Sequence, residues 1–277
     1  AGLTAVLAKQ GVRTTDSTLA TALRTPVVLL GAWGMTLLSG SVHETGQVGA
    51  RSLVYLVLSG LATGASWLCY FKALQLGDVS KVAPVDKMST VLTVIMAVLL
   101  LGEGLSALGA VGLALVTVGT LLMLRAEDLR SLPRALAGGG GWLLYALGAA
   151  LFAALTAILG KIGIAAVPSD LGTAIRTGIV LVMAWVMVGV AGRLGSATRV
   201  PRGEMIWILL SGAATCASWL CYFRALQDGP ASVVVPIDKL SVLVSVAFSV
   251  LVLREHVGVR ALLGLAMLVV GTVALAL

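Results

Sequence analysis

Charged side chains inside apolar segments are the residues of this chain with the clearest chemical potential. Lys9, Arg24 and the pair Asp86-Lys87 each stand among apolar residues in the first half of the chain. An ionised group is costly to place in hydrocarbon, so it usually contacts a second charge, a ligand or water. Arginine suits carboxylates and phosphates because its planar guanidinium donates two parallel hydrogen bonds. These residues therefore predict a site that binds or gates a small anionic group.

The second half of the chain contains the same charged set. Each residue recurs 152 positions later, as Lys161, Arg176, Asp238 and Lys239. Each set holds three cations and one carboxylate, so the carboxylate can neutralise only one partner. Either Lys9 and Lys161 extend to the membrane interface, or an anion or the anionic part of a zwitterion neutralises the remaining positive charge. A third interpretation is structural, with Asp86 in a static ion pair with Arg24 or Lys87.

Prolines and aromatic residues accompany the charged sets. Pro84 and Pro236 stand two residues before the Asp-Lys pairs and each removes a backbone donor, so we expect both to kink a helix. Transporters place substrate and ion sites at such interruptions. Each copy also has a tryptophan and a tyrosine one helical turn apart. These four residues could line a cavity or, alternatively, pack against other helices or form an interfacial belt. They are Trp67, Tyr70, Trp219 and Tyr222.

Other patterns predict structure rather than chemistry. Glu103 and Glu255 follow an apolar segment in each half, and we expect them to accept hydrogen bonds from exposed amides at the start of the next segment. The three cysteines show no metal-ligand spacing and no disulfide framework. The chain has no catalytic triad, zinc or phosphate-loop pattern, so we expect no catalytic residue, metal ion or cofactor, and no enzyme activity.

Composition places these residues in a lipid bilayer. Hydrophobic residues make up 59% of the chain and charged residues 11%, whereas a soluble domain carries about a quarter charged residues. The chain is therefore predicted to be an integral, multi-pass membrane protein. Its net charge of +7 fits lysines and arginines in cytoplasmic loops rather than nucleic-acid binding.

The repeat extends along the whole chain and predicts its helices. Ser66 to Gln75 recurs as Ser218 to Gln227, and each copy contains five apolar segments. Backbone polar groups in lipid must be paired internally, so these segments are predicted to be helices. The first segment looks truncated at its start. The ten predicted helices cover residues 1–12, 17–39, 53–74, 80–101, 105–124, 142–166, 169–191, 205–226, 232–253 and 257–276.

An odd number of helices in each copy has a topological consequence. The second copy must enter the membrane in the opposite orientation, so we expect an all-α transmembrane fold of two inverted five-helix repeats. The repeats are predicted over residues 1–125 and 142–277, with a linker over 126–141. Most basic loop residues fall on the face that holds the linker, which predicts that this face is cytoplasmic.

Three short motifs occur in both copies and carry a family resemblance. They are Tyr70-Phe71-Lys72-Ala73-Leu74, Pro84 and the Leu-Gly-Glu that ends at Glu103, with Tyr222 to Leu226, Pro236 and Glu255 in the second copy. On these motifs the chain resembles the EamA-type branch of the drug/metabolite transporter superfamily. The Asp-Lys after each proline is similar to a subgroup that includes single five-helix proteins, of which this chain looks like the fused form.

The resemblance implies ten helices around a central cavity, alternating access and chain ends in the cytoplasm, although the loop charges predict the opposite orientation. Members export amino acids and other small metabolites, and relatives exchange sugar phosphates or nucleotide sugars. We therefore expect a permease, an exporter or exchanger of a small anionic or zwitterionic metabolite, in the bacterial cytoplasmic membrane. We expect a monomer or homodimer, and Asp86 and Asp238 could carry a coupling proton, because removal from water favours a neutral carboxyl group.

Three alternatives stay open at this point. The two aspartates could bind an organic cation in a drug exporter, which the excess of cations disfavours. A lateral opening between helices would favour a lipid flippase. A sealed centre with every charge paired would favour a membrane scaffold that transports nothing.

Overall fold

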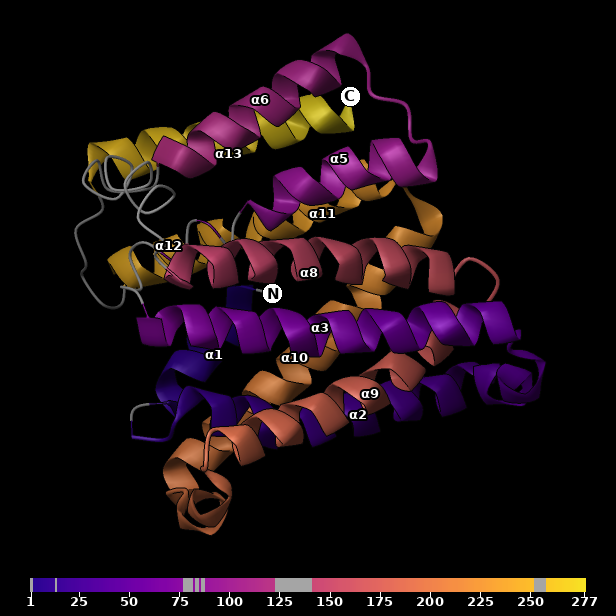
Figure 1. Ribbon diagram of the computed structural model, residues 1–277, viewed down its shortest axis with the longest axis vertical. Coiled ribbons are helices and arrows are strands. Elements are labelled where there is room, and N and C mark those ends of the chain that lie inside the picture. The colour runs from indigo at the N-terminus through magenta and orange to yellow at the C-terminus, as the bar shows by residue number, and fades with distance from the viewer. Residues whose placement is uncertain are drawn as a thin grey trace. The chain divides into compact units, whose positions relative to one another are not determined.

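The computed structural model describes residues 2–12, 14–76, 82, 85, 88–122, 141–251 and 258–277. In these ranges it contains α-helices and two short 3-10 helices, and no strand (Figure 1). The α-helices are α1 Gly2–Gly11, α2 Ser17–Ser39, α3 Ala50–Leu76, α5 Ser89–Leu101, α6 Ala107–Leu122, α8 Gly141–Gly163, α9 Ser169–Val190, α10 Arg202–Asp228, α11 Ala231–Lys239, α12 Ser241–Leu251 and α13 Val259–Ala276. The 3-10 helices are η1 Ser41–Gln47 and η2 Leu194–Arg199.

Helix length and composition confirm the prediction of an all-α transmembrane protein. Within the described residues, seven helical stretches are long and apolar enough to cross a membrane. In the predicted fourth segment of the first copy, α5 begins at Ser89, and the described residues Val82 and Val85 before it are also helical. Pro84, Asp86 and Lys87 lie outside the described residues.

Contacts divide the chain into two compact units, each built from both sequence copies. The first unit comprises Ala1–Gly64 and Leu159–Asp228. Within it, α2 packs against both α9 and α10, and α1 packs against α10. Because α2 and α9 are equivalent segments of the two copies, this unit contains a pair of counterpart helices in contact.

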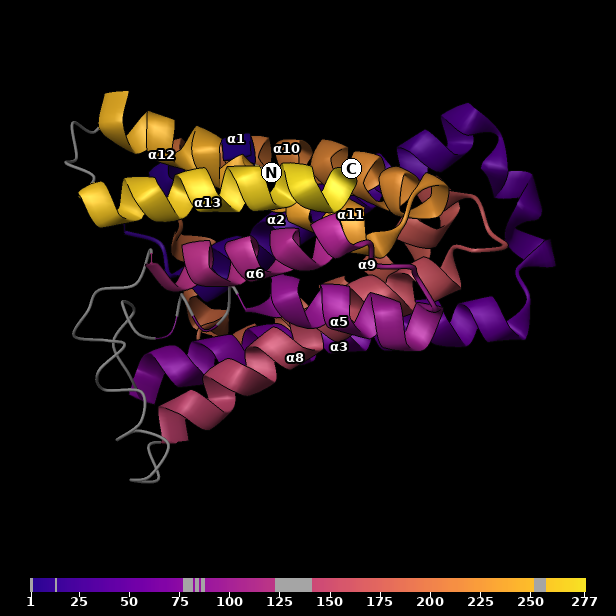
Figure 2. The ribbon, with the colours of Figure 1, turned by 90° about the horizontal axis from the view of Figure 1, so that it is seen from above.

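The second unit comprises Ala65–Ile158 and Gly229–Leu277, and it contains a second pair of counterparts. In this unit α6 and α13 lie side by side (Figure 1 and Figure 2). A Cβ atom added at Gly112 would lie 2.6 Å from the Gly271 carbonyl oxygen, and one added at Gly119 would lie 2.6 Å from that of Gly264. Contacting residue numbers rise along one helix and fall along the other, so α6 and α13 are antiparallel.

The segment predicted as one helix over residues 232–253 is broken in the structure. Helix α11 ends at Lys239, α12 begins at Ser241, and the Leu240 amide donates to the Ile237 carbonyl at 3.0 Å. The break therefore lies one turn beyond Pro236. The counterpart of Leu240 is Met88, whose amide donates to the Val85 carbonyl at 3.1 Å just before α5.

Glu103 caps a helix, but not the one that its position in the sequence predicts. Its two carboxylate oxygens accept hydrogen bonds from the Ala231 and Ser232 amides at 2.7 and 2.8 Å. These are the first residues of α11, in the other copy, so the prediction of the next helix along the chain was wrong. The first amides of a helix lack intrahelical partners and favour negative charge, and no side chain at the Pro230 cap accepts from them. Glu255 lies outside the described residues.

Replacing Glu103 with glutamine should lower the thermal stability of the protein. The change removes the charge and places an amide donor opposite a backbone donor, which should cost about 1–2 kcal/mol, as for the loss of a helix cap. The measurement is the unfolding midpoint in detergent. Glu44→Gln, in the exposed η1, serves as the matched control. Equal midpoints for the two variants would show that the cap on α11 does not stabilise the fold.

Candidate functional site

The first unit contains four of the predicted site cations. Lys9 lies in the last turn of α1, Arg24 within α2, Lys161 in the last turn of α8 and Arg176 within α9. Asp238 and Lys239 lie at the end of α11 in the second unit, beside the break at Leu240. The structure therefore brings two cations of the first set and two cations of the second set into one unit.

Arg24 and Lys9 line a pocket of about 270 Å³ between α1, α2 and α10. Each of α1 and α2 contributes residues spaced three, four and seven positions apart, which is one face of a helix. The full lining is Ala5, Ala8, Lys9, Val12, Ser17, Ala20, Thr21, Arg24, Ile208 and Ser211. The lining includes an arginine, a lysine and three hydroxyl side chains, and most of its surface is apolar. Arginine and lysine can both bind a carboxylate or phosphate group.

Polar contacts hold the helices that carry this pocket. Glu204 of α10 accepts hydrogen bonds from the Thr14 amide, the Thr14 hydroxyl and the Thr15 amide, at 3.0, 2.7 and 2.9 Å. Asp16 then caps α2 by accepting from the Thr18 and Leu19 amides. The connection between α1 and α2 is therefore tied to the start of α10, the third helix of the pocket.

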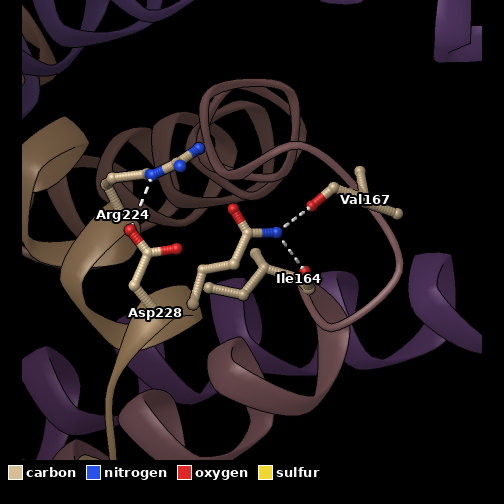
Figure 3. Close-up of polar contacts among 5 residues, drawn as sticks. Ile164, Val167, Arg224 and Asp228 are labelled. Carbon is tan, nitrogen blue, oxygen red and sulfur yellow. Dashed lines mark hydrogen bonds and ion pairs between the residues drawn. The ribbon is translucent and has the colours of Figure 1, made fainter.

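A similar contact fixes the end of α8, next to Lys161. The side-chain amide of Gln227 donates to the carbonyl oxygens of Ile164 and Val167, both at 2.8 Å; the two acceptors are labelled in Figure 3. The neighbouring pair Arg224 and Asp228 forms an exposed ion pair at 2.8 Å on the same helix, α10. Because helix ends leave carbonyl groups without partners, Gln227 stabilises the chain where it leaves α8.

Arg176 is the most completely buried charged group of the described residues. Its side chain is 2% exposed, and Nη2 donates to the Thr63 hydroxyl at 2.8 Å while Nε lies 3.4 Å from the Ser59 hydroxyl. The guanidinium carbon lies 4.8 Å from the ring centre of Trp219 and 4.5 Å from that of Phe223, within the range of cation–π attraction. In the described part of the chain, Nη1 is buried and has no hydrogen-bond partner.

Arg24 and Arg176 are held by equivalent helix contacts. A Cβ atom added at Gly60 of α3 would lie 3.0 Å from the Arg176 carbonyl oxygen. One added at Gly212 of α10, the counterpart of Gly60, would lie 2.9 Å from the Arg24 carbonyl oxygen. The missing side chains let the helices approach closely. One local architecture therefore occurs twice, with Arg24 partly buried beside a pocket and Arg176 almost completely buried.

The predicted aromatic residues have different surroundings. Trp219 stacks on Arg176, and the ring of Tyr222 contacts that of Phe223 edge-on at 5.2 Å. In the second unit, Tyr70 packs against a buried apolar cluster that includes Val82 and Leu143. Sequence reasoning missed Ser59, Thr63 and Phe223. The available signal was that the hydroxyls are one helical turn apart and recur as Ser211 and Thr215.

Comparisons with known proteins place the chain in a family. The model of the EamA-like transporter family matches residues 1–125 and 140–277. A curated relative from Sinorhizobium sp., named an uncharacterized transporter in the cobO 3′ region, is 46% identical over 123 residues, which is 44% of this chain and 87% of the relative. A solved crystal structure at 17% identity shares the fold, with a TM-score of 0.73 over 99% of this chain and 92% of its own. The chain therefore belongs to the EamA-like transporter family, and it is a multi-pass membrane transporter.

Proposed function

We propose that this transporter carries a small anionic or zwitterionic metabolite, such as an amino acid, across the bacterial cytoplasmic membrane as an exporter or exchanger. It works by alternating access between two inverted five-helix repeats. The observation that carries this proposal is the pocket of about 270 Å³ whose lining includes two cations, Lys9 and Arg24, and three hydroxyl side chains.

The pocket suits a small ligand with one anionic end. Arg24 offers a planar pair of donors to a carboxylate or phosphate, and Lys9 adds a compact positive charge. Hydroxyls of Ser17, Thr21 and Ser211 can accept from an ammonium group, so a zwitterion is accommodated as well. The volume lies just below the ~300–1,000 Å³ of pockets for drug-sized ligands, which favours a small metabolite over a large drug.

Two features support alternating access. The antiparallel contact of α6 and α13 joins counterpart helices, which is the relation expected of inverted copies. Arg24 lies beside a pocket while its counterpart Arg176 is 2% exposed. A transporter of this kind needs one half-site open while the other is closed, and an exchange between these two arrangements would carry the ligand across.

The aspartates complete the proposal as gating or coupling groups. Asp238 and Lys239 lie at a broken helix, where transporters commonly place ion and substrate sites. In the shut state each aspartate would neutralise a cation of its set, and in the open state the substrate anion would replace it. An organic-cation exporter remains the second candidate through these aspartates, but the two cations of the pocket disfavour it.

Thermal unfolding of the purified protein with a ligand panel tests this function. The panel contains amino acids, organic acids, phosphorylated sugars and organic cations. A ligand present at 100 times its Kd should stabilise the protein by about 2.7 kcal/mol, and we expect this for anions or amino acids. The stabilisation should disappear in Arg24→Gln and persist in Arg51→Gln, an exposed arginine at the start of α3. A response to cations alone would support the second candidate, and no response to any ligand would contradict both.

A further inference from the structure

The pocket at Arg24 has a counterpart in the same unit that is filled with side chains. The lining residues of the Arg24 pocket have counterparts 152 positions away in the other sequence copy. Those counterparts include Leu56, Ser59, Gly160, Ile164, Gly172 and Arg176. Leu56 and Ile164 are fully buried, and Arg176 is 2% exposed. The same helical faces that enclose a pocket in one place therefore enclose packed atoms in the other.

Two glycines account for this packing. A Cβ atom added at Gly160 would lie 2.7 Å from Phe223 Cε1, and one added at Gly172 would lie 2.6 Å from Ile164 Cγ2. At the equivalent positions of the open pocket the chain has Ala8 and Ala20, which carry that Cβ atom. Phe223 and Ile164 thus occupy space that exists only because both residues are glycine.

Arg176 is incompletely satisfied in this closed arrangement. Ser59 and Thr63 accept from Nε and Nη2, while Nη1 is buried without a partner among the described residues. A buried donor without a partner costs about 1–3 kcal/mol, and more when it belongs to a charged group. A carboxylate or phosphate oxygen at Nη1 would satisfy it and neutralise the charge.

We propose that Arg176, Ser59 and Thr63 form a second anion-binding pocket, closed in this structure by Phe223 over Gly160 and Ile164 over Gly172. This inference rests on the alternating access proposed above and assigns its second half-site. The pocket opens when both apolar side chains withdraw. Nη1 of the guanidinium then binds the anionic group of the ligand, and the glycines determine how completely the pocket closes again.

Exchanging glycine for alanine tests the proposal in the full-length protein. Gly160→Ala/Gly172→Ala gives the closed pocket the residues of the open one and should keep Phe223 and Ile164 out. The readout is modification by phenylglyoxal, which reacts with arginine, followed at Arg24 and Arg176 separately by peptide mass spectrometry. In the unmodified sequence Arg176 should react at least about tenfold more slowly than Arg24, and in the double variant at a similar rate. Gly178→Ala is the matched control, because Gly178 lies on α9 with Gly172 and has no atom within 4 Å of its Cβ position.

Inorganic phosphate and acetate are the probes for the ligand. Either anion should slow the modification of Arg176 in the double variant, as it slows that of Arg24 in the unmodified protein. An Arg176 that becomes reactive but is protected by neither anion would overturn the second site, and so would one that stays unreactive. Loss of protection at Arg24 itself would instead contradict the proposed function. If the double variant fails to fold, Phe223→Leu removes the covering ring without crowding the backbone and is read in the same way.

Discussion

Replacing Arg176 with glutamine should lower the transport rate of the reconstituted protein by about 100-fold. Hydrogen bonds to a charged group contribute about 1.5–3 kcal/mol, and each 1.4 kcal/mol corresponds to a factor of ten. Glutamine cannot neutralise an anion and offers one amide group where arginine offers a planar fork. The measurement is uptake into proteoliposomes of the metabolite found by the ligand panel.

Stability separates this effect from a general loss of structure. Arg176 is buried with one nitrogen unsatisfied, so removing its charge also removes a desolvation cost. The unfolding midpoint of Arg176→Gln should therefore stay close to that of the unmodified protein, although its transport rate falls by about 100-fold. Arg224→Gln is the control, because its ion pair with Asp228 is 67% and 59% exposed and such pairs contribute about 0–1 kcal/mol. Transport by Arg176→Gln at the rate of Arg224→Gln would contradict the role of Arg176.

The helices were predictable because lipid leaves the backbone few choices. The segment predicted over residues 17–39 has the bounds of α2, Ser17–Ser39, since apolar runs long enough to cross a membrane must pair their own amides. An interruption of the segment over residues 232–253 was expected from Pro236, and the break at Leu240 lies one turn beyond that proline. The partner of Glu103 was not predictable in the same way, because it depends on which helix of the other copy lies nearby, and the sequence pattern alone does not specify that neighbour.

The candidate site was predictable in its charges but not in its contacts. Arg24 and Arg176 stand out because a cation in an apolar run needs an explanation. Ser59 and Thr63 do not stand out, because hydroxyl groups in membrane helices commonly bond their own backbone, as Thr63 does to the Ser59 carbonyl at 2.9 Å. The pairing of Arg24 with Asp86 stays a prediction, since Asp86 lies outside the described residues.

Replacing Gly112 with alanine should destabilise the second unit, although alanine is the better helix former. On propensity alone the change favours the helix by about 1 kcal/mol. The new Cβ atom would, however, lie 2.6 Å from the Gly271 carbonyl oxygen and 2.9 Å from the Leu275 amide nitrogen. Backbone atoms cannot rotate away, so α6 and α13 must separate, and overpacking of this kind costs about 1–3 kcal/mol.

Gly34→Ala shows what the same substitution does without a close neighbour. Gly34 lies within α2 and its Cβ position has no atom within 4 Å, so this variant should unfold at the same temperature as the unmodified protein or slightly above it. Gly112→Ala should unfold below both, and adding Gly119→Ala should lower the midpoint further, because Gly119 meets Gly264 in the same way. If Gly112→Ala raised the midpoint as Gly34→Ala does, the two helices would not approach closely in the folded protein. The antiparallel contact of α6 and α13, which supports inverted repeats, would then be contradicted as well. This measurement therefore tests the inverted-repeat architecture independently of any ligand.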